Sequence, residues 1–274
     1  MASGEPLAPL KPQVYSDPRP ASHFDRLHAY ARTHEPGRFY TFVRVVSYPY
    51  CRIAFRLRTE SIGNVPAAGP VILAPNHFSA MDHWFVGIML PRRVRFMAKS
   101  QLFSGAVMDW ILTRGGAFPV RRGKSDEAAI ETALTLLDRG GMLVIYPEGG
   151  RSRSGQIGDR ARPGIGRLAL DSGAPVVPVA VIGSERARNW RRLQFPSVTV
   201  RYGAPISFDR EQDPSRERQQ EVANEIFAAL KSLHAGRAHI GGAPTSGARP
   251  SAVPATLARR TSAASPPARY RTYS

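Results

Sequence analysis

Short apolar runs alternate with amphipathic segments between residues 70 and 203. Runs of branched aliphatic residues between turn residues predict buried strands, and apolar residues that recur every three or four positions predict helices. The predicted strands are residues 71–74, 94–98, 142–146, 176–182 and 198–202. The predicted helices are residues 81–90, 102–112, 126–137, 165–170 and 215–233. This alternation predicts an α/β fold: a single domain with a central mixed or largely parallel sheet flanked by helices.

The N-terminal segments have a different pattern. Residues 1–37 are rich in proline and predict an arm with one short helix near residues 21–33. Residues 38–58 combine aromatic and aliphatic residues with five arginines and no acid, and their apolar residues recur at helical spacing. Pro49 predicts a break between two short helices. Such a cationic amphipathic element suits a membrane surface, although a core-facing helix with a solvated outer face has the same periodicity.

The C-terminal residues 236–274 consist mainly of Gly, Ala, Ser, Pro, Thr and Arg, with no acid. This composition cannot bury a core and predicts a disordered basic tail. We therefore divide the chain into an N-terminal arm (1–37), amphipathic helices that associate with a membrane (38–58), the α/β domain (59–235) and the tail.

The net charge of the chain indicates which kinds of partner it favours. The chain of 274 residues has 38 Lys and Arg against 21 Asp and Glu, a formal net charge of +17. Such a balance favours anionic partners: a membrane surface, a nucleic acid or a phosphorylated substrate. The single cysteine excludes an intramolecular disulfide and favours a reducing cytosolic setting. Residues 1–13 lack the apolar stretch of a signal peptide, and no run of eighteen uncharged apolar residues occurs, so we expect neither export nor a membrane span.

Polar residues with candidate chemistry follow the first predicted strand of the domain. His77 and Asp82 are five positions apart, at a predicted turn from strand to helix. There the carboxylate can accept the proton of one ring nitrogen and leave the other nitrogen basic, so the pair is a candidate general base for an alcohol that attacks a carbonyl. A structural histidine beside a helix-capping acid has the same spacing. His83 also permits a metal site with His77 and Asp82, but no fourth ligand is evident.

Two further segments combine glycines with cations. Residues 115–122 end in Arg121 and Arg122, with Lys124 close behind; paired guanidinium groups can bind a phosphate, whereas the alternative is a solvated loop. Residues 146–152 follow another predicted strand, and there Glu148 can bind a hydroxyl of a polyol and Arg151 its phosphate. Gly149 and Gly150 would let the ligand approach the backbone closely.

Together, these segments resemble the glycerolipid acyltransferases of the 1-acylglycerol-3-phosphate acyltransferase type, over roughly residues 38–203. Residues 76–82 resemble the family's Asn-His-x4-Asp motif, and residues 99–103 its Lys-x-x-Leu-Phe segment. Residues 116–122 are similar to Gly-x-Phe-x-x-x-Arg, 146–152 to Phe/Tyr-Pro-Glu-Gly-x-Arg-Ser, and 177–179 to Val-Pro-Val. Gly150 departs from the family's usual Thr, and Arg121 stands where Asp or another residue is frequent.

The resemblance implies transfer of an acyl chain from a thioester to a lysophospholipid hydroxyl, most directly from 1-acylglycerol-3-phosphate to phosphatidic acid, without an acyl-enzyme. It implies that His77 is the base and that Asp82 orients it. The residues expected to bind substrate are Lys99, Arg121, Arg122, Glu148, Gly149, Gly150, Arg151 and Ser152. We expect no metal and no bound cofactor, with acyl-CoA or acyl-ACP (acyl carrier protein) as co-substrate.

The resemblance also places residues 38–58 where the family has a two-helix membrane element. We therefore expect a peripheral protein on the cytoplasmic face of the cell membrane, with the anionic membrane surface as partner, acyl carrier protein as a further candidate partner and no nucleic acid. Another lysophospholipid or a glycolipid acceptor is the nearest alternative.

Two other classes remain as alternatives. A hydrolase would use Ser79 or Ser152 as nucleophile, but no Gly-x-Ser-x-Gly motif occurs. A non-enzymatic basic protein that binds membranes or nucleic acid would account for the net charge alone.

Overall fold

The computed structural model describes residues 7, 10, 16–123 and 126–236. The predicted tail beyond Gly236, together with Lys124, lies outside the described residues. No helix in the described part of the chain is both long enough and apolar enough to cross a bilayer.

A seven-stranded sheet organises the domain, with the strand order β1-β7-β6-β2-β5-β3-β4. Neighbouring strands are parallel except for the antiparallel pair β6 and β7, which confirms the predicted α/β class with a mostly parallel sheet. The strands are β1 (Arg58–Glu60), β2 (Val71–Pro75), β3 (Val94–Lys99), β4 (Ala117–Val120), β5 (Met142–Val144), β6 (Val176–Ile182) and β7 (Thr199–Tyr202).

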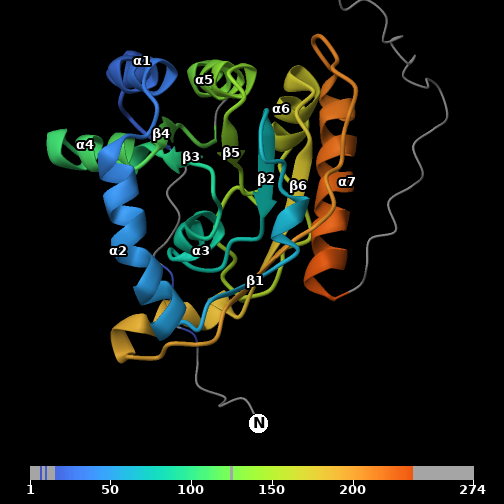
Figure 1. Ribbon diagram of the computed structural model, residues 1–274. Coiled ribbons are helices and arrows are strands. Elements are labelled where there is room, and N and C mark those ends of the chain that lie inside the picture. The colour runs from blue at the N-terminus through green and yellow to red at the C-terminus, as the bar shows by residue number, and fades with distance from the viewer. Residues whose placement is uncertain (1–6, 8–9, 11–15, 124–125, 237–274) are drawn as a thin grey trace, which may run out of the picture. The chain divides into compact units, whose positions relative to one another are not determined.

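Helices cover both faces of the sheet (Figure 1). They are α1 (Asp25–Thr33), α2 (Arg38–Ala54), α3 (Asp82–Ile88), α4 (Ala106–Arg114), α5 (Glu127–Asp138), α6 (Gly164–Ser172) and α7 (Arg216–His234). Short 3-10 helices span Ala21–Phe24, Ile62–Asn64, Ser100–Leu102 and Ser184–Arg192.

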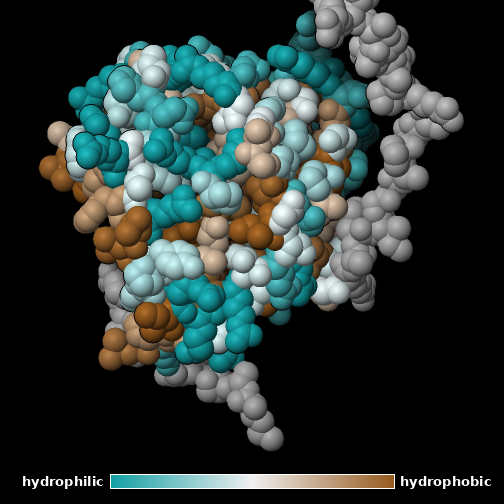
Figure 2. All heavy atoms as spheres, in the orientation of Figure 1, coloured by the Kyte–Doolittle hydropathy of each residue, from teal (hydrophilic) through white to brown (hydrophobic). Residues whose placement is uncertain are grey.

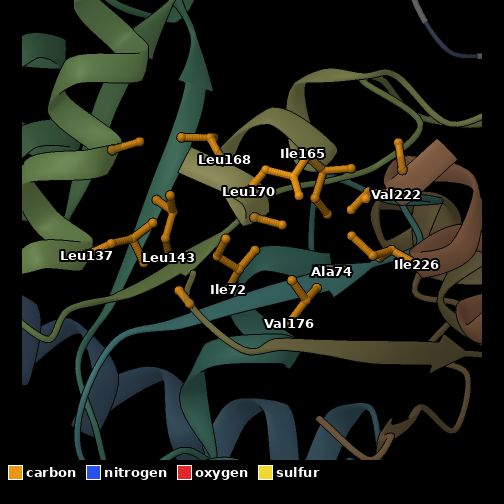
Figure 3. Packing of buried hydrophobic residues seen from close by; sticks show 14 of the residues in the cluster. Ile72, Ala74, Leu137, Leu143, Ile165, Leu168, Leu170, Val176, Val222 and Ile226 are labelled. Carbon is orange, nitrogen blue, oxygen red and sulfur yellow. The ribbon is translucent and has the colours of Figure 1, made fainter. Parts of the chain in front are cut away.

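Strand β2 separates two hydrophobic cores because its alternate side chains point to opposite faces of the sheet. Ile72 and Ala74 join the core formed with α5, α6 and α7, where Ile165 and Ile226 pack against the sheet (Figure 3). Val71 and Leu73 join the second core, on the side of α3. Burial on both faces explains why this strand has a continuous apolar sequence.

The structure corrects the predicted break at Pro49. Residues 38–54 form one helix, α2, with Pro49 inside it. A proline inside a helix removes one hydrogen bond and kinks the helix without always ending it. Packing against α3 and buried contacts of Tyr40 and Cys51 hold the helix on both sides of the proline.

Two edge strands were not predicted from the pattern. Strand β4 occupies part of the segment 115–122, which we interpreted as a candidate phosphate-binding segment with a solvated loop as the alternative, and it contains Pro119. An edge strand tolerates proline because one side of its backbone has no partner strand. Strand β1 at the opposite edge has only three residues. Neither run is long enough to show an alternating pattern.

The helix predicted over residues 102–112 begins later, at Ala106. The 3-10 turn Ser100–Leu102 precedes it, and Gly105, with a φ of 149°, separates the two. The short helix predicted in the N-terminal arm is confirmed as the 3-10 turn Ala21–Phe24 followed by α1.

The described part of the arm packs firmly on the domain. Phe24 and Leu27 enter a small core with Phe103, and the His28 ring lies 3.0 Å from the Thr132 hydroxyl of α5. Arg19 pairs with the buried carboxylate of Asp17 at 2.7 Å. These contacts fix the arm against the segment that follows β3.

Candidate active site

His77 and Asp82 meet at the carboxyl end of β2. Asn76 anchors this end, since its side chain donates to the Val181 carbonyl at 2.9 Å and accepts from the Val181 N–H at 2.7 Å. The chain then turns into α3, and Asp82 is the first residue of this helix. His77 Nδ1 lies 2.9 Å from Asp82 Oδ2, as the sequence spacing predicted.

The Asp82 carboxylate is fully buried and organises the turn. Its Oδ2 also accepts hydrogen bonds from the backbone N–H groups of Phe78 at 2.7 Å and Ser79 at 2.8 Å. The carboxylate therefore orients His77 and also holds the backbone of the turn that precedes α3. It does not act as the helix cap, since Met81 is the N-cap residue and has no side-chain cap hydrogen bond.

The environment keeps the imidazole of His77 neutral. Burial lowers the pKa of His77 below its usual value, the hydrogen bond to Asp82 opposes this shift, and the nearby Arg151 and Arg122 add to it. Because Asp82 accepts the proton of Nδ1, Nε2 is the basic nitrogen; this tautomer is assigned from the hydrogen bond. The Tyr146 ring stacks on the imidazole with centroids 3.9 Å apart.

Glu148 lies behind this site. Its Oε1 accepts from the N–H of His77 at 3.3 Å, and its Oε2 accepts from the N–H of Gly158 at 3.1 Å. Burial raises the pKa of Glu148, and both hydrogen bonds oppose that rise. The carboxylate thus supports the backbone around His77 and is not part of the cavity lining.

A second loop packs against the turn that contains His77. It follows β5, and its Ser152 N–H donates to the His77 carbonyl at 2.8 Å. Gly149 turns this loop with a φ of 69°, a conformation that glycine adopts without strain. The loop thereby brings Arg151 close to His77.

A cavity of about 580 Å³ opens in front of His77. Its polar lining includes His77, Lys99, Arg122 and Arg151. Its apolar lining comes mainly from α2, α3 and α4 and includes Phe39, Val43, Trp84, Ile88, Ile111 and Leu112. Burial lowers the pKa of Lys99, and the charges of Arg122 and Arg151 lower it further, so the three cations are close neighbours. Such a cluster attracts an anion.

The structure divides the predicted site residues into two groups. His77, Lys99, Arg122 and Arg151 line the cavity, whereas Asp82, Arg121, Glu148, Gly149, Gly150 and Ser152 do not. The backbone N–H of Arg121 donates to Asp126 at 2.7 Å. Asp126 in turn caps α5, since its side chain accepts from the N–H of Ala129. Sequence analysis did not single out Tyr146 as a site residue; its only signal was its position at the start of the 146–152 motif.

The metal alternative finds no support in the geometry. Within residues 16–123 and 126–236, no group of three His, Cys, Asp or Glu side chains is arranged to hold a metal ion. His83 lines the cavity, and burial together with His77 lowers its pKa to about 4, which keeps it uncharged at neutral pH.

The mostly parallel sheet carries a His–Asp pair at a strand end beside a cationic cavity, an arrangement that suits general-base chemistry. Residues 56–182 match the model of the family described as Acyltransferase. All the predicted site residues lie within this range. Together with the relatives described next, this match supports the resemblance to the glycerolipid acyltransferases that the motifs predicted.

Similar proteins carry related names. The chain is 27% identical over 172 residues to a 1-acyl-sn-glycerol-3-phosphate acyltransferase of Bacillus subtilis. That match covers 62% of this chain and 84% of the Bacillus protein. It is 26% identical over 140 residues to the chloroplastic 1-acyl-sn-glycerol-3-phosphate acyltransferase LPAT1 of Arabidopsis thaliana. That match covers 50% of this chain but only 38% of the plant protein.

A solved structure shares the fold. The 1-acyl-sn-glycerophosphate (LPA) acyltransferase PlsC of Thermotoga maritima superposes with a TM-score of 0.54 at 20% sequence identity. The superposition covers 78% of this chain and 89% of that one.

Proposed function

We propose that this protein transfers an acyl chain from a thioester to the free hydroxyl of a lysophospholipid, with 1-acylglycerol-3-phosphate as the first candidate acceptor. One observation carries the proposal: a neutral imidazole oriented by a buried carboxylate, three clustered cations and an apolar wall all line one cavity. An acceptor of this kind needs a base for its hydroxyl, cations for its phosphate and apolar surface for its acyl chain.

In this mechanism, His77 Nε2 takes the proton of the acceptor hydroxyl as the oxygen attacks the thioester carbonyl. The hydrogen bond from Nδ1 to Asp82 stabilises the imidazolium that forms. Collapse of the tetrahedral intermediate breaks the C–S bond, and His77 returns the proton to the departing thiolate. An ester and a free thiol result, and no covalent enzyme intermediate is needed.

The contacts of the two candidate serine nucleophiles favour this direct transfer over hydrolysis. The Ser79 hydroxyl accepts from the N–H of Met81 at 3.2 Å, and the Ser152 hydroxyl lies 3.2 Å from that of Ser154. Among the described residues, His77 makes its side-chain hydrogen bond to Asp82 and to neither serine. A serine hydrolase requires that missing contact.

Exposed apolar side chains support a membrane surface as partner. In α2, Phe42 is 65% exposed and Ile53 77% exposed, and in α4 Val107 is 72% exposed. Figure 2 shows hydrophobic side chains gathered on the left of the view, over the positions of α2 and α4 in Figure 1. Both helices also line the cavity. We infer that they rest on an anionic leaflet, so that a lysolipid reaches His77 directly from the membrane.

An activity assay tests the reaction. Purified protein is incubated with a panel of lysolipids, each with acyl-CoA or with acyl-ACP, and the products are identified by mass spectrometry. We expect an acylated lysophosphatidic acid, and the preferred donor identifies the thioester carrier. Absence of product with every pair, or equal product from His77→Ala, would contradict the proposal.

Vesicle flotation tests the membrane contact separately. The double variant Phe42→Ser with Ile53→Ser should bind anionic vesicles at least about tenfold more weakly, since it removes two apolar side chains from the interface. Neutral vesicles and an oligonucleotide serve as comparisons. Stronger binding to the oligonucleotide than to anionic vesicles would favour the nucleic-acid alternative.

A further inference from the structure

Arg188 ties together the two loops that form the candidate active site. It lies in the 3-10 helix Ser184–Arg192, which follows β6 and is outside the residues matched by the family model. Its Nε donates to the Phe78 carbonyl at 2.6 Å. Its Nη1 donates to the Arg153 carbonyl at 3.0 Å, and its Nη2 donates to the Ser152 carbonyl. One guanidinium thus binds three backbone oxygens from two separate loops.

These oxygens lie next to the groups proposed to do the chemistry. Phe78 directly follows His77, and Ser152 directly follows Arg151. The two loops also meet through the N–H of Ser152, which donates to the His77 carbonyl at 2.8 Å. A planar guanidinium has a rigid fork of donors, so it fixes the separation of the loops better than a single hydrogen bond can.

The charge of Arg188 lies among the charged groups of the site. Burial lowers the pKa of Arg188, the carboxylate of Asp82 opposes that shift, and Arg151 adds to it. The guanidinium therefore interacts with the acid that orients His77 and with a cation of the cavity.

Arg92 makes the same kind of contact at the opposite end of the same two strands. Its Nη1 donates to the Pro66 carbonyl at 2.9 Å. Its Nη2 donates to the carbonyls of Gly69 and Gly140, each at 2.6 Å. These residues precede β2 and β5, whereas the partners of Arg188 follow β2 and β5. The chain thus contains a matched pair of arginines, and only Arg188 contacts the loops that carry His77 and Arg151.

We propose that Arg188 is a positioning residue for acyl transfer. It holds the turn that contains His77 and the loop that contains Arg151 at the separation at which His77 reaches the acceptor hydroxyl while Arg151 binds the acceptor phosphate. The proposal rests on the proposed function.

The test compares Arg188→Gln, Arg188→Lys and Arg92→Gln. For each variant, kcat and KM for the lysophospholipid are measured together with the melting temperature and with hydrogen exchange of peptides that cover residues 76–82 and 149–154. A small displacement of reacting groups costs up to about a hundredfold in rate, so we expect Arg188→Gln to lower kcat/KM by about thirtyfold. Arg188→Lys should recover part of this loss because it keeps the charge and one donor.

Arg92→Gln is the control for stability. It should lower the melting temperature as Arg188→Gln does, while its kcat/KM stays within about twofold of wild type because the carboxyl ends of the strands are untouched. Exchange should rise in residues 76–82 and 149–154 for Arg188→Gln, and in residues 66–71 and 139–142 for Arg92→Gln.

Equal kinetic losses in the Arg188 and Arg92 variants, or unchanged exchange of residues 76–82 and 149–154 in both Arg188 variants, would overturn the proposal. If the wild-type protein transfers no acyl group, the proposed function fails, and the exchange data then decide by themselves whether Arg188 holds the two loops together.

Discussion

The two ends of strands β2 and β5 differ in how their polar groups are satisfied. Each end has an arginine that binds three carbonyl oxygens, Arg92 at the amino end and Arg188 at the carboxyl end. At the amino end, Gly141 also lies close against the end of α5. At the carboxyl end, Asp82 Oδ1 and Tyr146 Oη are buried, and neither has a hydrogen-bond partner among the described residues. The pKa values of His77 and Lys99 at that end are also shifted.

The amino and carboxyl ends of these strands therefore have different roles within one sheet. Tightly packed groups at the amino end stabilise the fold, and the buried polar atoms without a described partner, Asp82 Oδ1 and Tyr146 Oη, lie at the carboxyl end beside the cavity. Substitutions at the two ends should therefore separate activity from stability.

The largest effect is expected from His77→Ala at the carboxyl end. Loss of a positioned base lowers the rate by roughly 10² to 10⁴ fold. The circular dichroism spectrum should stay close to wild type, since Asp82 keeps its hydrogen bonds from the N–H groups of Phe78 and Ser79 when the imidazole is removed. Turnover above about a tenth of wild type would mean that another group accepts the proton.

Asp82→Asn should have the next largest effect. The amide cannot hold His77 in the same tautomer, and it presents an N–H group or a weaker acceptor to the N–H donors of Phe78 and Ser79. We expect kcat to fall by about 10² fold with little change in KM, because acceptor binding is left intact. Initial-rate kinetics over a range of acceptor concentrations separate the two constants.

Arg151→Ala should change binding more than the chemical step. Removal of one phosphate-binding cation should raise the acceptor KM by about tenfold, the equivalent of about 1.4 kcal/mol. A monoacylglycerol acceptor, which has no phosphate, provides the control, and its KM should not change. An equal loss with both acceptors would place the phosphate elsewhere.

A smaller effect is expected on the pH dependence. Only the neutral imidazole can accept a proton, so kcat/KM is lost as the pH falls through the pKa of His77. Burial lowers this pKa, which predicts an acid limb below the usual histidine value of 6.5. Arg122→Gln removes a charge that also lowers the pKa and should move the limb toward higher pH. A limb that moves the other way would contradict this electrostatic account.

At the amino end, Gly141→Ala should leave turnover unchanged and lower stability. The added Cβ would lie 2.5 Å from the Leu136 carbonyl oxygen, so the backbone must shift, at a cost of about 1 to 3 kcal/mol. Gly164→Ala is the matched control, since nothing lies within 4 Å of the Cβ added there. Loss of kcat in the folded Gly141 variant would show that the two ends are coupled.

The sequence predicted the parts of this molecule that depend on local pattern. His77 and Asp82 are separated by one turn, so their spacing alone brings them together, and β2 is recognisable because it is buried on both faces. The single helix through Pro49 could not be predicted in this way, because contacts distant in sequence hold it. The short edge strands are too brief to carry a periodic signal.

The sequence predicted which kinds of side chain form the candidate site better than it predicted which of them face the cavity. Glu148 was expected to bind a ligand hydroxyl, but its carboxylate accepts from two backbone N–H groups. Tyr146 begins a recognised motif, but the motif does not show that its ring stacks on His77. Arg188 acts through carbonyl contacts over long sequence separations, which leave no recognisable motif. Positions in a motif therefore indicate the loops of a site better than they indicate which side chains face the ligand.

On the proposed membrane contact, the proline inside α2 limits how far this helix can sink into a leaflet. Because Pro49 has no N–H, the Val45 carbonyl receives no hydrogen bond from the residue four positions later. In hydrocarbon an unpaired carbonyl costs several kcal/mol, whereas water or a lipid headgroup supplies the missing donor. The helix should therefore rest at the level of the ester linkages, the depth at which the hydroxyl of a lysolipid lies.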